Sequence, residues 1–297
     1  MPDTVKAALL LYGLTDAKAQ LLRDYENLVY QVEADQTYAL RICSDDSDQE
    51  QLLTEVEWLA AIRAETDLLV PKPVPNQDGN WVSHVNGRMC VLFEWLAGEP
   101  VSEQMSGAIA RRIGEMMATL HHHAEHYRPR HPVESRFDYD YFFGDQSWWQ
   151  TRASQRLSED YQSLLPAVKK AQDLLKYLGE SPAHFGMSHT DIHFGNVLQK
   201  GDTLAIIDFG DCGLGYYLTD LAVTEAEFRD YPEADSLIQN FREGYRQVRG
   251  YVPNEKDIRT AAVMASLLYL EWVFESENDK VREDKAEWLP DIIADLQ

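Results

Sequence analysis

The sequence predicts an α+β protein with two lobes, in which an antiparallel-sheet N-lobe with one main helix precedes a mostly helical C-lobe. Between residues 19 and 93, five short stretches alternate apolar and polar residues or are rich in β-branched ones, with one helical pattern among them. From residue 102 onward, apolar residues recur mainly at helical spacing. We therefore place the N-lobe at residues 1–95 and the C-lobe at residues 96–297.

The expected sheet of the N-lobe has five strands, and a short helix precedes it. In chain order we expect a helix over residues 5–12 and strands over residues 19–24, 28–32, 37–42, 81–85 and 89–93. The first strand is the weakest of these in β-forming residues. The last two flank Asn86-Gly87, a dipeptide typical of tight hairpin turns, and so close the sheet as a hairpin.

The main helix of the N-lobe is predicted to start at Ser47. Ser47 and Glu50 have the spacing of a capping box, in which each side chain bonds the other residue's backbone. The apolar positions that follow repeat at helical spacing, and they are Leu52, Val56, Leu59 and Ile62. The helix must end before residues 70–75, because their three prolines favour an extended backbone.

The C-lobe is expected to consist mainly of helices. Their predicted ranges are residues 102–127, 149–178, 218–229, 234–248, 255–274 and 285–296. An aromatic loop over residues 137–149 and a β-like island over residues 184–207 interrupt this pattern. We interpret the aromatic residues of that loop mainly as packing groups of the helical lobe.

The charge of the chain limits its partners. Its 297 residues include 27 Lys and Arg against 50 Asp and Glu, a formal net charge of −23. Nucleic-acid binding needs clustered cations, so we expect no nucleic-acid partner. No apolar stretch has the length of a membrane span or a signal-peptide core, and three scattered cysteines favour a reducing compartment. We expect a cytoplasmic protein without a membrane partner, and the oligomeric state stays open.

The densest chemistry lies between residues 189 and 210. Asp191 follows His189 in a His-x-Asp pattern, Asn196 comes five residues after Asp191, and residues 208–210 read Asp-Phe-Gly. Phosphoryl transfer needs a carboxylate that orients the attacking hydroxyl and oxygen ligands that hold magnesium beside the phosphates. Asp191 fits the first role, and Asn196 with Asp208 fits the second. The joint spacing is that of a kinase catalytic loop and is far more specific than any single element.

With these motifs, the sequence resembles the aminoglycoside phosphotransferase and choline kinase-like family of small-molecule kinases over nearly its whole length. Within that family it is most similar to the branch of homoserine kinase type II and bacterial stress-response kinases. The segments that carry this likeness are residues 26–32, 38–41, 93–98, 137–140 and 208–213. The resemblance implies a protein kinase-like two-lobe fold and the use of ATP with Mg²⁺. It also implies transfer of the γ-phosphate to a hydroxyl of a small molecule.

The resemblance also implies roles for single residues. Asp191 matches the catalytic base, and Asn196 and Asp208 match the magnesium ligands. Arg41 takes the place of the strand lysine that contacts the α- and β-phosphates, and an acidic residue on the following helix would pair with it. Helical periodicity favours Glu55 for this partner, because it lies nearer the apolar face than the reserve candidate, Glu57.

Other matches concern the adenine, the loop above the phosphates and the catalytic loop. Residues 93–96, which are Phe93, Glu94, Trp95 and Leu96, match the linker whose backbone holds adenine. Asp220 matches an aspartate that braces the catalytic loop. Residues 25–27, between the first two strands, contain no glycine, so the usual glycine-rich phosphate cover is absent. Phosphate contact there would fall to other backbone N–H groups or to a side chain such as Asn27.

The acceptor is not identified by these motifs, because one scaffold serves many alcohols. The acidity favours a cationic acceptor such as an aminoglycoside or amino alcohol, and it does not separate these from homoserine-like or hydroxylysine-like acceptors. Glu271, Glu275 and residues 277–279 are the best candidates for an acidic patch, although an ordinary solvated face is the commoner origin of such a cluster. Asp211 is a further carboxylate that could face the acceptor or a second metal ion.

Two alternatives to a small-molecule kinase stay open. A Ser/Thr protein kinase of the stress-response type is disfavoured by the short stretch between Asp208 and Asp220, which lacks the usual activation segment. A non-catalytic nucleotide-binding module is suggested by the missing glycine loop and disfavoured by the intact Asp191. A metal site at His122 and His126, four residues apart, is not expected, because no glutamate lies between them at the usual place.

Overall fold

The computed structural model describes residues 1–24, 27–45, 47–276, 289–290 and 293. The chain forms two compact units. Unit 1 comprises Met1–Pro100, Pro129–Glu134 and Asn196–Gly210, and unit 2 comprises Val101–Arg128, Ser135–Gly195 and Asp211–Gln297. The lobe boundary expected after residue 95 stays a prediction. The compact units are divided differently, because unit 1 takes in two later segments of the chain.

Unit 1 is built on an antiparallel sheet. Its strands are β1 (Lys18–Asp24), β2 (Leu28–Glu33), β3 (Thr37–Ile42), β4 (Pro73–Val74), β5 (Val82–Val85) and β6 (Arg88–Glu94). The order is β1-β2-β3-β6-β4, with β5 also paired to β6. Alternate residues of β2 and β3 point to a core that contains Val32, Leu40 and Ile42, each at most 1% exposed. The five strands expected from alternation are therefore present, together with the short β4 in the proline-rich stretch.

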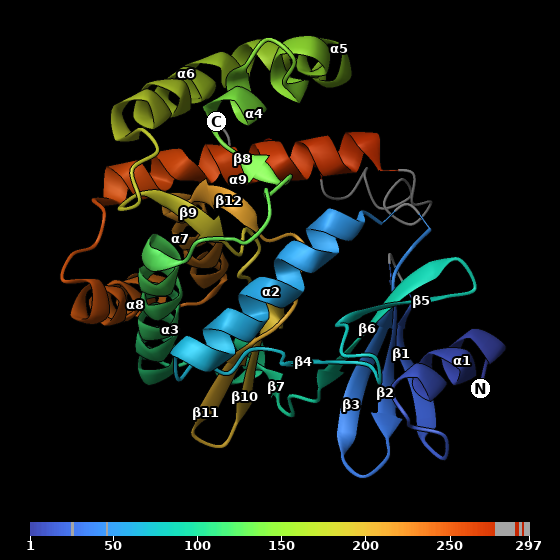
Figure 1. Cartoon of the computed structure of the whole chain (residues 1–297). Coiled ribbons are helices and arrows are strands. Elements are labelled where there is room, and N and C mark those ends of the chain that lie inside the picture. Colours follow the sequence, from blue (N-terminus) through green and yellow to red (C-terminus); the bar gives the residue numbers. More distant parts are fainter. Residues whose placement is uncertain (25–26, 46, 277–288, 291–292, 294–297) are drawn as a thin grey trace. The chain divides into compact units, whose positions relative to one another are not determined.

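Two helices accompany this sheet within unit 1. Helix α1 (Asp3–Leu11) packs near β5, as Figure 1 shows, and α2 (Gln49–Glu65) follows β3. The N-cap residue of α2 lies one position later than the predicted Ser47. The cap is Asp48, whose side chain accepts a hydrogen bond from Gln51 N at 2.8 Å, whereas the Ser47 hydroxyl bonds Ser44 at 2.9 Å. The Asp48 carboxylate, rather than the Ser47 hydroxyl, therefore caps the helix.

A second sheet of unit 1 contains the two strands of the later segment Asn196–Gly210. Strand β10 (Val197–Lys200) pairs with β11 (Thr203–Ile206) as a hairpin and with β7 (Glu99–Pro100) on its other side. The backbone N–H of Ile206 also donates to Leu69 O at 2.9 Å. These bonds attach the hairpin to the rest of unit 1.

Unit 2 is mainly helical. Its α-helices are α3 (Gly107–His126), α4 (Tyr139–Phe143), α5 (Ser154–Leu157), α6 (Tyr161–Leu178), α7 (Tyr217–Glu227), α8 (Ala234–Arg249) and α9 (Glu255–Glu275). A small sheet joins them, with β12 (Gly213–Tyr216) between β8 (Arg136–Phe137) and β9 (Phe185–Ser188). Helix α9 packs against α6 and α7.

Two predicted helices of the C-lobe differ from the structure. The first starts with a 3₁₀ turn over Val101–Gln104, and α3 itself begins later because Ser106 caps it. The second is broken at Ser158, whose φ of 50° leaves the helical region and separates α5 from α6. The helix expected over residues 285–296 lies almost entirely outside the described residues. The aromatic loop, in turn, contains the short α4.

Helices α3 and α8 lie side by side and touch through glycines (Figure 1). A Cβ atom on Gly114 would lie 2.0 Å from the carbonyl oxygen of Phe241, and one on Gly244 would lie 1.9 Å from that of Arg111. Only glycine permits backbones to approach this closely. The contact fixes the spacing of the two helices.

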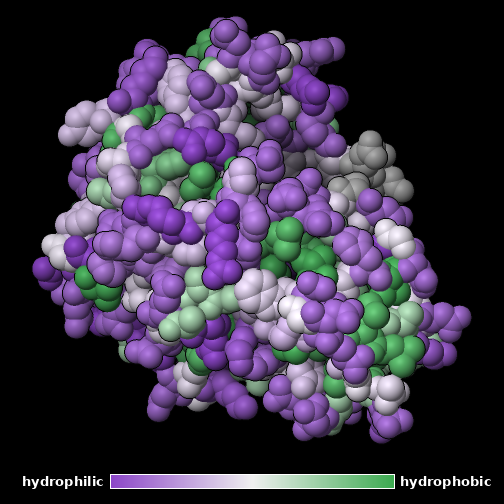
Figure 2. Space-filling view, in the orientation of Figure 1, coloured by the Kyte–Doolittle hydropathy of each residue, from purple (hydrophilic) through white to green (hydrophobic). Residues whose placement is uncertain are grey.

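The face of the molecule shown in Figure 2 is mostly hydrophilic, as the composition of the chain leads one to expect. In the described part of the chain, no helix combines the length and the apolar character that crossing a bilayer requires. The three cysteines are free thiols, and all are buried.

Candidate functional site

The two predicted metal ligands lie at the same end of the β10–β11 hairpin, within unit 1. The hairpin pairs Val197 with Ile206, and the N–H of Ile207 donates to the carbonyl oxygen of Asn196 at 2.9 Å. Asn196 and Asp208 therefore flank this last pair. Asn196 is 5% exposed, and Asp208 has a left-handed φ of 64°. An amide and a carboxylate oxygen at one end of a rigid hairpin suit a hard cation such as Mg²⁺.

Asp208 forms an ion pair that sequence reasoning missed. The Nη1 atom of Arg23, at the end of β1, donates to Asp208 Oδ2 at 2.9 Å. Both side chains are accessible, with 61% of Arg23 and 39% of Asp208 exposed. The two residues are 185 positions apart, so local sequence patterns could not pair them. The one available signal was a cation directly before the glycine-free loop.

Arg41 and Glu55 form the buried pair that helical periodicity favoured. Arg41 Nη2 on β3 donates to Glu55 Oε2 on α2, and both side chains are nearly inaccessible. The reserve candidate, Glu57, instead lies 3.4 Å from His131 Nε2. Burial opposes the charge of Arg41, but the charge and hydrogen bond of Glu55 outweigh it and raise the Arg41 pKa above its ordinary value. The guanidinium also lies over the Phe93 ring of β6, 5.5 Å from its centroid.

Arg41 keeps one donor for which the described residues offer no acceptor. Its Nε atom is buried and has no hydrogen-bond partner in the described part of the chain. A Cβ atom on Gly210 would lie 3.7 Å from Arg41 Nη1 and 3.8 Å from Asp208 Oδ1, so the small residue separates cation and carboxylate. A buried unsatisfied donor is costly unless a ligand meets it. This donor set fits a phosphate group with its magnesium ion.

The Asp-Phe-Gly segment is anchored to α2. Phe209 is fully buried and meets the Trp58 ring edge to face at 5.5 Å. The side chain of Gln51 donates from Nε2 to the carbonyl oxygen of Gly210 at 3.0 Å. These two contacts hold the segment at Phe209 and at Gly210, and Asp208 is therefore presented by a fixed backbone.

Asn27, the candidate phosphate ligand of the glycine-free loop, has a structural bond. Its Oδ1 atom accepts a hydrogen bond from the backbone N–H of Ser44 at 3.1 Å. The side chain thus ties the start of β2 to the end of β3. This contact occupies the amide oxygen, and an amide nitrogen is the group that would face a phosphate.

The predicted adenine linker follows β6. The backbone N–H groups of Glu94 and Trp95 donate to the carbonyl oxygens of Lys72 (2.9 Å) and Thr37 (3.2 Å). The Glu94 carboxylate forms a 2.7 Å ion pair with Lys72. Trp95 and Leu96 are half-buried. Since the sheet uses two of the linker N–H groups, adenine binding would depend on the linker carbonyls and on later N–H groups.

In unit 2, Asp220 braces the backbone that leads to Asp191. The carboxylate of Asp220, on α7, accepts hydrogen bonds from the N–H groups of His189 (3.1 Å) and Thr190 (2.6 Å). It also contacts His121 Nε2 on α3 at 3.0 Å. Asp220 is fully buried. The contacts to two consecutive N–H groups hold Thr190 at a left-handed φ of 73°, a conformation that is strained for a β-branched residue.

Burial and hydrogen bonding fix the charges of this brace. Burial lowers the pKa of His121, and Asp220 opposes that shift without reversing it. Burial raises the pKa of Asp220, but the hydrogen bond and charge of His121 outweigh it, and the net shift is downward. His121 is therefore a neutral imidazole that donates from Nε2 to a charged carboxylate. Its Nδ1 atom meets the hydroxyl of Tyr245 at 2.9 Å, which selects this tautomer.

Asp191, the predicted base, is 31% exposed and lies near His193. The His193 Nε2 atom is 3.6 Å from Asp191 Oδ2. The N–H of Gly195 donates to His193 Nδ1 at 3.0 Å, so the ring proton is on Nε2 and faces the carboxylate. The arrangement orients His193 toward Asp191 rather than making it a second base.

Further carboxylates gather around Asp191 within unit 2. Tyr269 on α9 is influenced by Asp191, Glu227 and Asp211, and their negative charges add to the effect of burial in raising its pKa to about 12. The nearby Tyr141 also has a raised pKa, from burial first, then from Glu271 and Asp211. This region is thus negative and carries phenol groups.

The expected acidic patch is only partly present. Glu271 accepts a 2.8 Å hydrogen bond from Tyr141 Oη, and burial raises its pKa. Glu275 is neutralised by Arg152 at 2.6 Å and Arg156 at 3.3 Å. Residues 277–279 lie outside the described part of the chain. Of the two described members, Glu271 is not paired with an arginine. Glu275 is paired with two arginines and is therefore not free to attract a cationic acceptor.

Comparisons with known proteins agree with this geometry. The profile of the Phosphotransferase enzyme family matches residues 19–253. Amicoumacin kinase of Bacillus subtilis (strain 168) is 25% identical over 229 residues, which are 74% of this chain and 66% of that protein. A Synechocystis protein is 24% identical over 217 residues, 70% of this chain and 58% of its own. The chain thus spans just under two thirds, or less, of these curated relatives.

Solved structures extend the likeness to nearly the whole chain. A microcompartment-associated aminopropanol kinase has a TM-score of 0.80 and 26% identity, covering 98% of this chain and 94% of its own. An amicoumacin kinase in complex with AMP-PNP and Ca²⁺ has a TM-score of 0.75 at 20% identity, covering 98% and 91%. The predicted kinase-like fold is confirmed. Since the family profile covers most of the sequence, the chain belongs to the Phosphotransferase enzyme family.

Proposed function

We propose that the protein is an ATP- and magnesium-dependent kinase that transfers the γ-phosphate to a hydroxyl group of a small, amine-bearing molecule. The observation that carries the nucleotide part is the end of the β10–β11 hairpin. There Asn196 and Asp208 offer oxygen ligands, and Arg41 has a buried donor that lacks an acceptor in the described part of the chain. The amicoumacin kinase structure, which contains AMP-PNP and Ca²⁺, gives further support.

Each residue has a role in this reaction. Asn196 and Asp208 would hold Mg²⁺, which would neutralise the negative charge of the phosphates. Arg41, locked by Glu55, would direct its free N–H toward a phosphate oxygen. Asp191 would orient the acceptor hydroxyl and take its proton, while the new O–P bond forms and the bond to the ADP oxygen breaks. His193 would keep the Asp191 carboxylate in place.

Arg23 is our candidate for the missing phosphate cover. It lies directly before the glycine-free loop, and its guanidinium already reaches the predicted metal ligand Asp208. A magnesium ion on Asp208 would compete with this guanidinium for the same oxygen. Arg23 would then turn to the triphosphate, which an arginine fork binds well.

The amine-bearing acceptor is supported by the charge around the predicted base. The charges of Asp191, Asp211 and Glu227 all raise the pKa of Tyr269. Glu271 accepts a hydrogen bond from the Tyr141 hydroxyl. An excess of carboxylates favours a cationic ligand. One structural relative is an aminopropanol kinase, whose named substrate combines an amine with an alcohol.

A protein substrate is less compatible with the described chain. Gly210 is followed by β12, which starts at Gly213, and then by α7, which starts at Tyr217. This leaves no segment of the length that protein kinases use to dock a peptide. The cytoplasmic location belongs to the same proposal and rests on the three free, buried cysteines.

The test is a magnesium-dependent ATP-consumption screen against amino alcohols, aminoglycosides, choline, homoserine, hydroxylysine, amine-free sugars and a generic protein. Asp191→Asn should lower kcat by about 10²–10⁴-fold while leaving nucleotide binding intact. Asp208→Ala should weaken binding of AMP-PNP with Mg²⁺. Asp173→Asn is the matched control, because this aspartate is 60% exposed and pairs only with Lys169 among the described ion pairs.

Two results would contradict the proposal. Full turnover by Asp191→Asn would remove the proposed base. Absence of AMP-PNP binding in calorimetry, with or without Mg²⁺, would remove the nucleotide site. A hit confined to acceptors without an amine would keep the kinase and overturn the acceptor class.

A further inference from the structure

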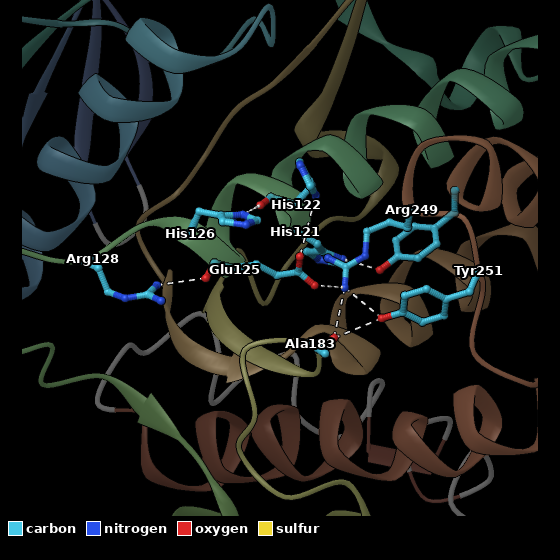
Figure 3. A network of polar contacts seen from close by, with 9 residues as sticks. His121, His122, Glu125, His126, Arg128, Ala183, Arg249 and Tyr251 are labelled. Carbon is cyan, nitrogen blue, oxygen red and sulfur yellow. Dashed lines mark hydrogen bonds and ion pairs between the residues drawn. The ribbon is translucent and has the colours of Figure 1, made fainter.

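The last turn of α3 carries a cluster that the proposed reaction does not use. His122, Glu125 and His126 each offer one ligand atom, and these atoms all lie within 4.8 Å of one another. Figure 3 shows the three side chains on one side of the helix. We propose that they form a binding site for a first-row divalent cation of the zinc type.

His126 already has the hydrogen bond of a metal ligand. Its Nδ1 atom lies 3.0 Å from the carbonyl oxygen of His122 and can only donate to it. The proton is therefore on Nδ1, and the lone pair of Nε2 points away from this bond. Histidines that bind metals are usually held in this way, with the second ring nitrogen on a carbonyl or carboxylate.

Glu125 is held by a buried arginine. Its Oε1 atom accepts from Arg249 Nη2 at 2.6 Å, and the Arg249 side chain is only 2% exposed. The same guanidinium nitrogen bonds the hydroxyl of Tyr251 at 2.8 Å and the carbonyl oxygen of Ala183 at 3.0 Å (Figure 3). The arginine fixes one carboxylate oxygen and leaves Oε2, which lies 3.7 Å from His122 Nδ1. The carboxylate is thus oriented and able to bridge arginine and cation.

The geometry suits a small, borderline-soft ion. The rings of His122 and His126 have centroids 5.1 Å apart and are tilted by 60°. A tetrahedral zinc ion lies about 2.1 Å from each ligand atom, which places two ligand atoms about 3.4 Å apart. The ligand atoms of these three residues lie within 4.8 Å of one another, so rotation of the exposed His122 ring would close the site. Two imidazoles and one carboxylate favour Zn²⁺, Ni²⁺ or Co²⁺ over Mg²⁺, which prefers oxygen ligands.

The position of the cluster also favours a cation. α3 ends at His126, and the C-terminal end of a helix carries partial negative charge. Sequence spacing alone did not favour this site, because the glutamate follows His122 by three positions and directly precedes His126. The structure shows that positions i, i+3 and i+4 converge, as neighbours on a helix surface do.

The test is calorimetric titration of the whole protein with Zn²⁺ in excess Mg²⁺, which saturates oxygen-ligand sites. We expect one Zn²⁺ per chain with micromolar affinity. The double variant His122→Ala/His126→Ala should bind it more than about tenfold more weakly, and Glu125→Gln about threefold or more. His84→Ala, at an exposed histidine of β5, is the control and should bind as the wild type does.

A second measurement reports the ligands directly. Co²⁺ should give the visible absorption of a low-symmetry nitrogen and oxygen site in the wild type, and the double variant should lose it. Zinc should also shift the imidazole ¹⁵N resonances of His122 and His126. Equal Zn²⁺ affinity in wild type and double variant, or no binding at one equivalent, would overturn the proposal. Unchanged melting temperatures without metal would show that the variants are folded.

Discussion

Two aspartates, Asp220 in unit 2 and Asp208 in unit 1, are held in opposite ways. Asp220 is fully buried and accepts hydrogen bonds from two backbone N–H groups and a neutral histidine. Asp208 is 39% exposed, and it forms an ion pair with the long side chain of Arg23, which is itself 61% exposed. The first carboxylate is permanently satisfied by the protein. The second is paired with an exposed cation, which under our proposal a magnesium ion would replace.

This difference separates stability from ligand binding. A buried carboxylate with several donors contributes strongly to folding, because removing it leaves those donors unsatisfied. An exposed ion pair contributes little, since solvent screens it and side-chain entropy opposes it. We therefore expect substitutions at Asp220 to act on the fold, and substitutions around Asp208 to act on the nucleotide.

The largest effect is expected for Asp220→Ala. The change leaves the N–H groups of His189 and Thr190 and the ring of His121 without their acceptor, at a cost of about 3–5 kcal/mol. Urea denaturation measures this free energy of unfolding. Asp173→Ala, at an exposed aspartate, should change it by less than about 0.5 kcal/mol. A loss below about 1 kcal/mol at Asp220 would show that the brace does not stabilise the fold.

Glu55→Gln should come next, because it leaves the Arg41 charge buried without a counter-ion. We expect a loss of about 2–3 kcal/mol in the free energy of unfolding, from the weakened charge-assisted hydrogen bond. Glu57→Gln is the matched control on the same helix and should cost less than about 1 kcal/mol. Equal effects of the two variants would mean that burial of the pair is unimportant.

The pH dependence of stability should reveal the lowered pKa of His121 in the folded protein. Its folded pKa is lowered, so the unfolded chain binds a proton near the ordinary value that the folded chain does not bind. Stability should therefore fall as pH decreases from 7.5 to 5.5, by at most about 1.4 kcal/mol for one such group. Asp220, with its lowered pKa, adds a loss at still lower pH. His121→Gln should flatten the first part of this profile, and an unchanged slope would assign it to another group.

The smallest energetic change is expected for Arg23→Gln. We expect AMP-PNP with Mg²⁺ to bind about fivefold more weakly, close to 1 kcal/mol, with unfolding changed by less than about 0.5 kcal/mol. Arg23→Lys should restore part of the affinity. Tighter nucleotide binding in the glutamine variant would instead make Arg23 a competitor of the metal ion.

Local patterns predicted much of the fold and part of the candidate site. Alternation located the sheet strands, and helical periodicity favoured Glu55 over Glu57 for the contact with Arg41. The role of the Arg41–Glu55 pair in nucleotide binding stays a proposal, as do the roles of Asp191, Asn196 and Asp208. The pairs Arg23–Asp208 and His121–Asp220 join residues 185 and 99 positions apart, and such contacts depend on tertiary packing that single segments do not encode. Helical spacing likewise did not predict the break at Ser158, where φ is 50°.

Gly114 and Gly244, at the contact between α3 and α8, should tolerate few substitutions. α3 carries His121 and Glu125, whereas α8 carries Tyr245 and Arg249, so the two helices supply both ends of the His121–Tyr245 hydrogen bond behind Asp220 and of the Glu125–Arg249 ion pair. A methyl group on Gly114 or Gly244 would force the helices apart by about an ångström or more, beyond hydrogen-bond reach. In a saturation library, both positions should be as intolerant as Asp220, although neither has a side chain.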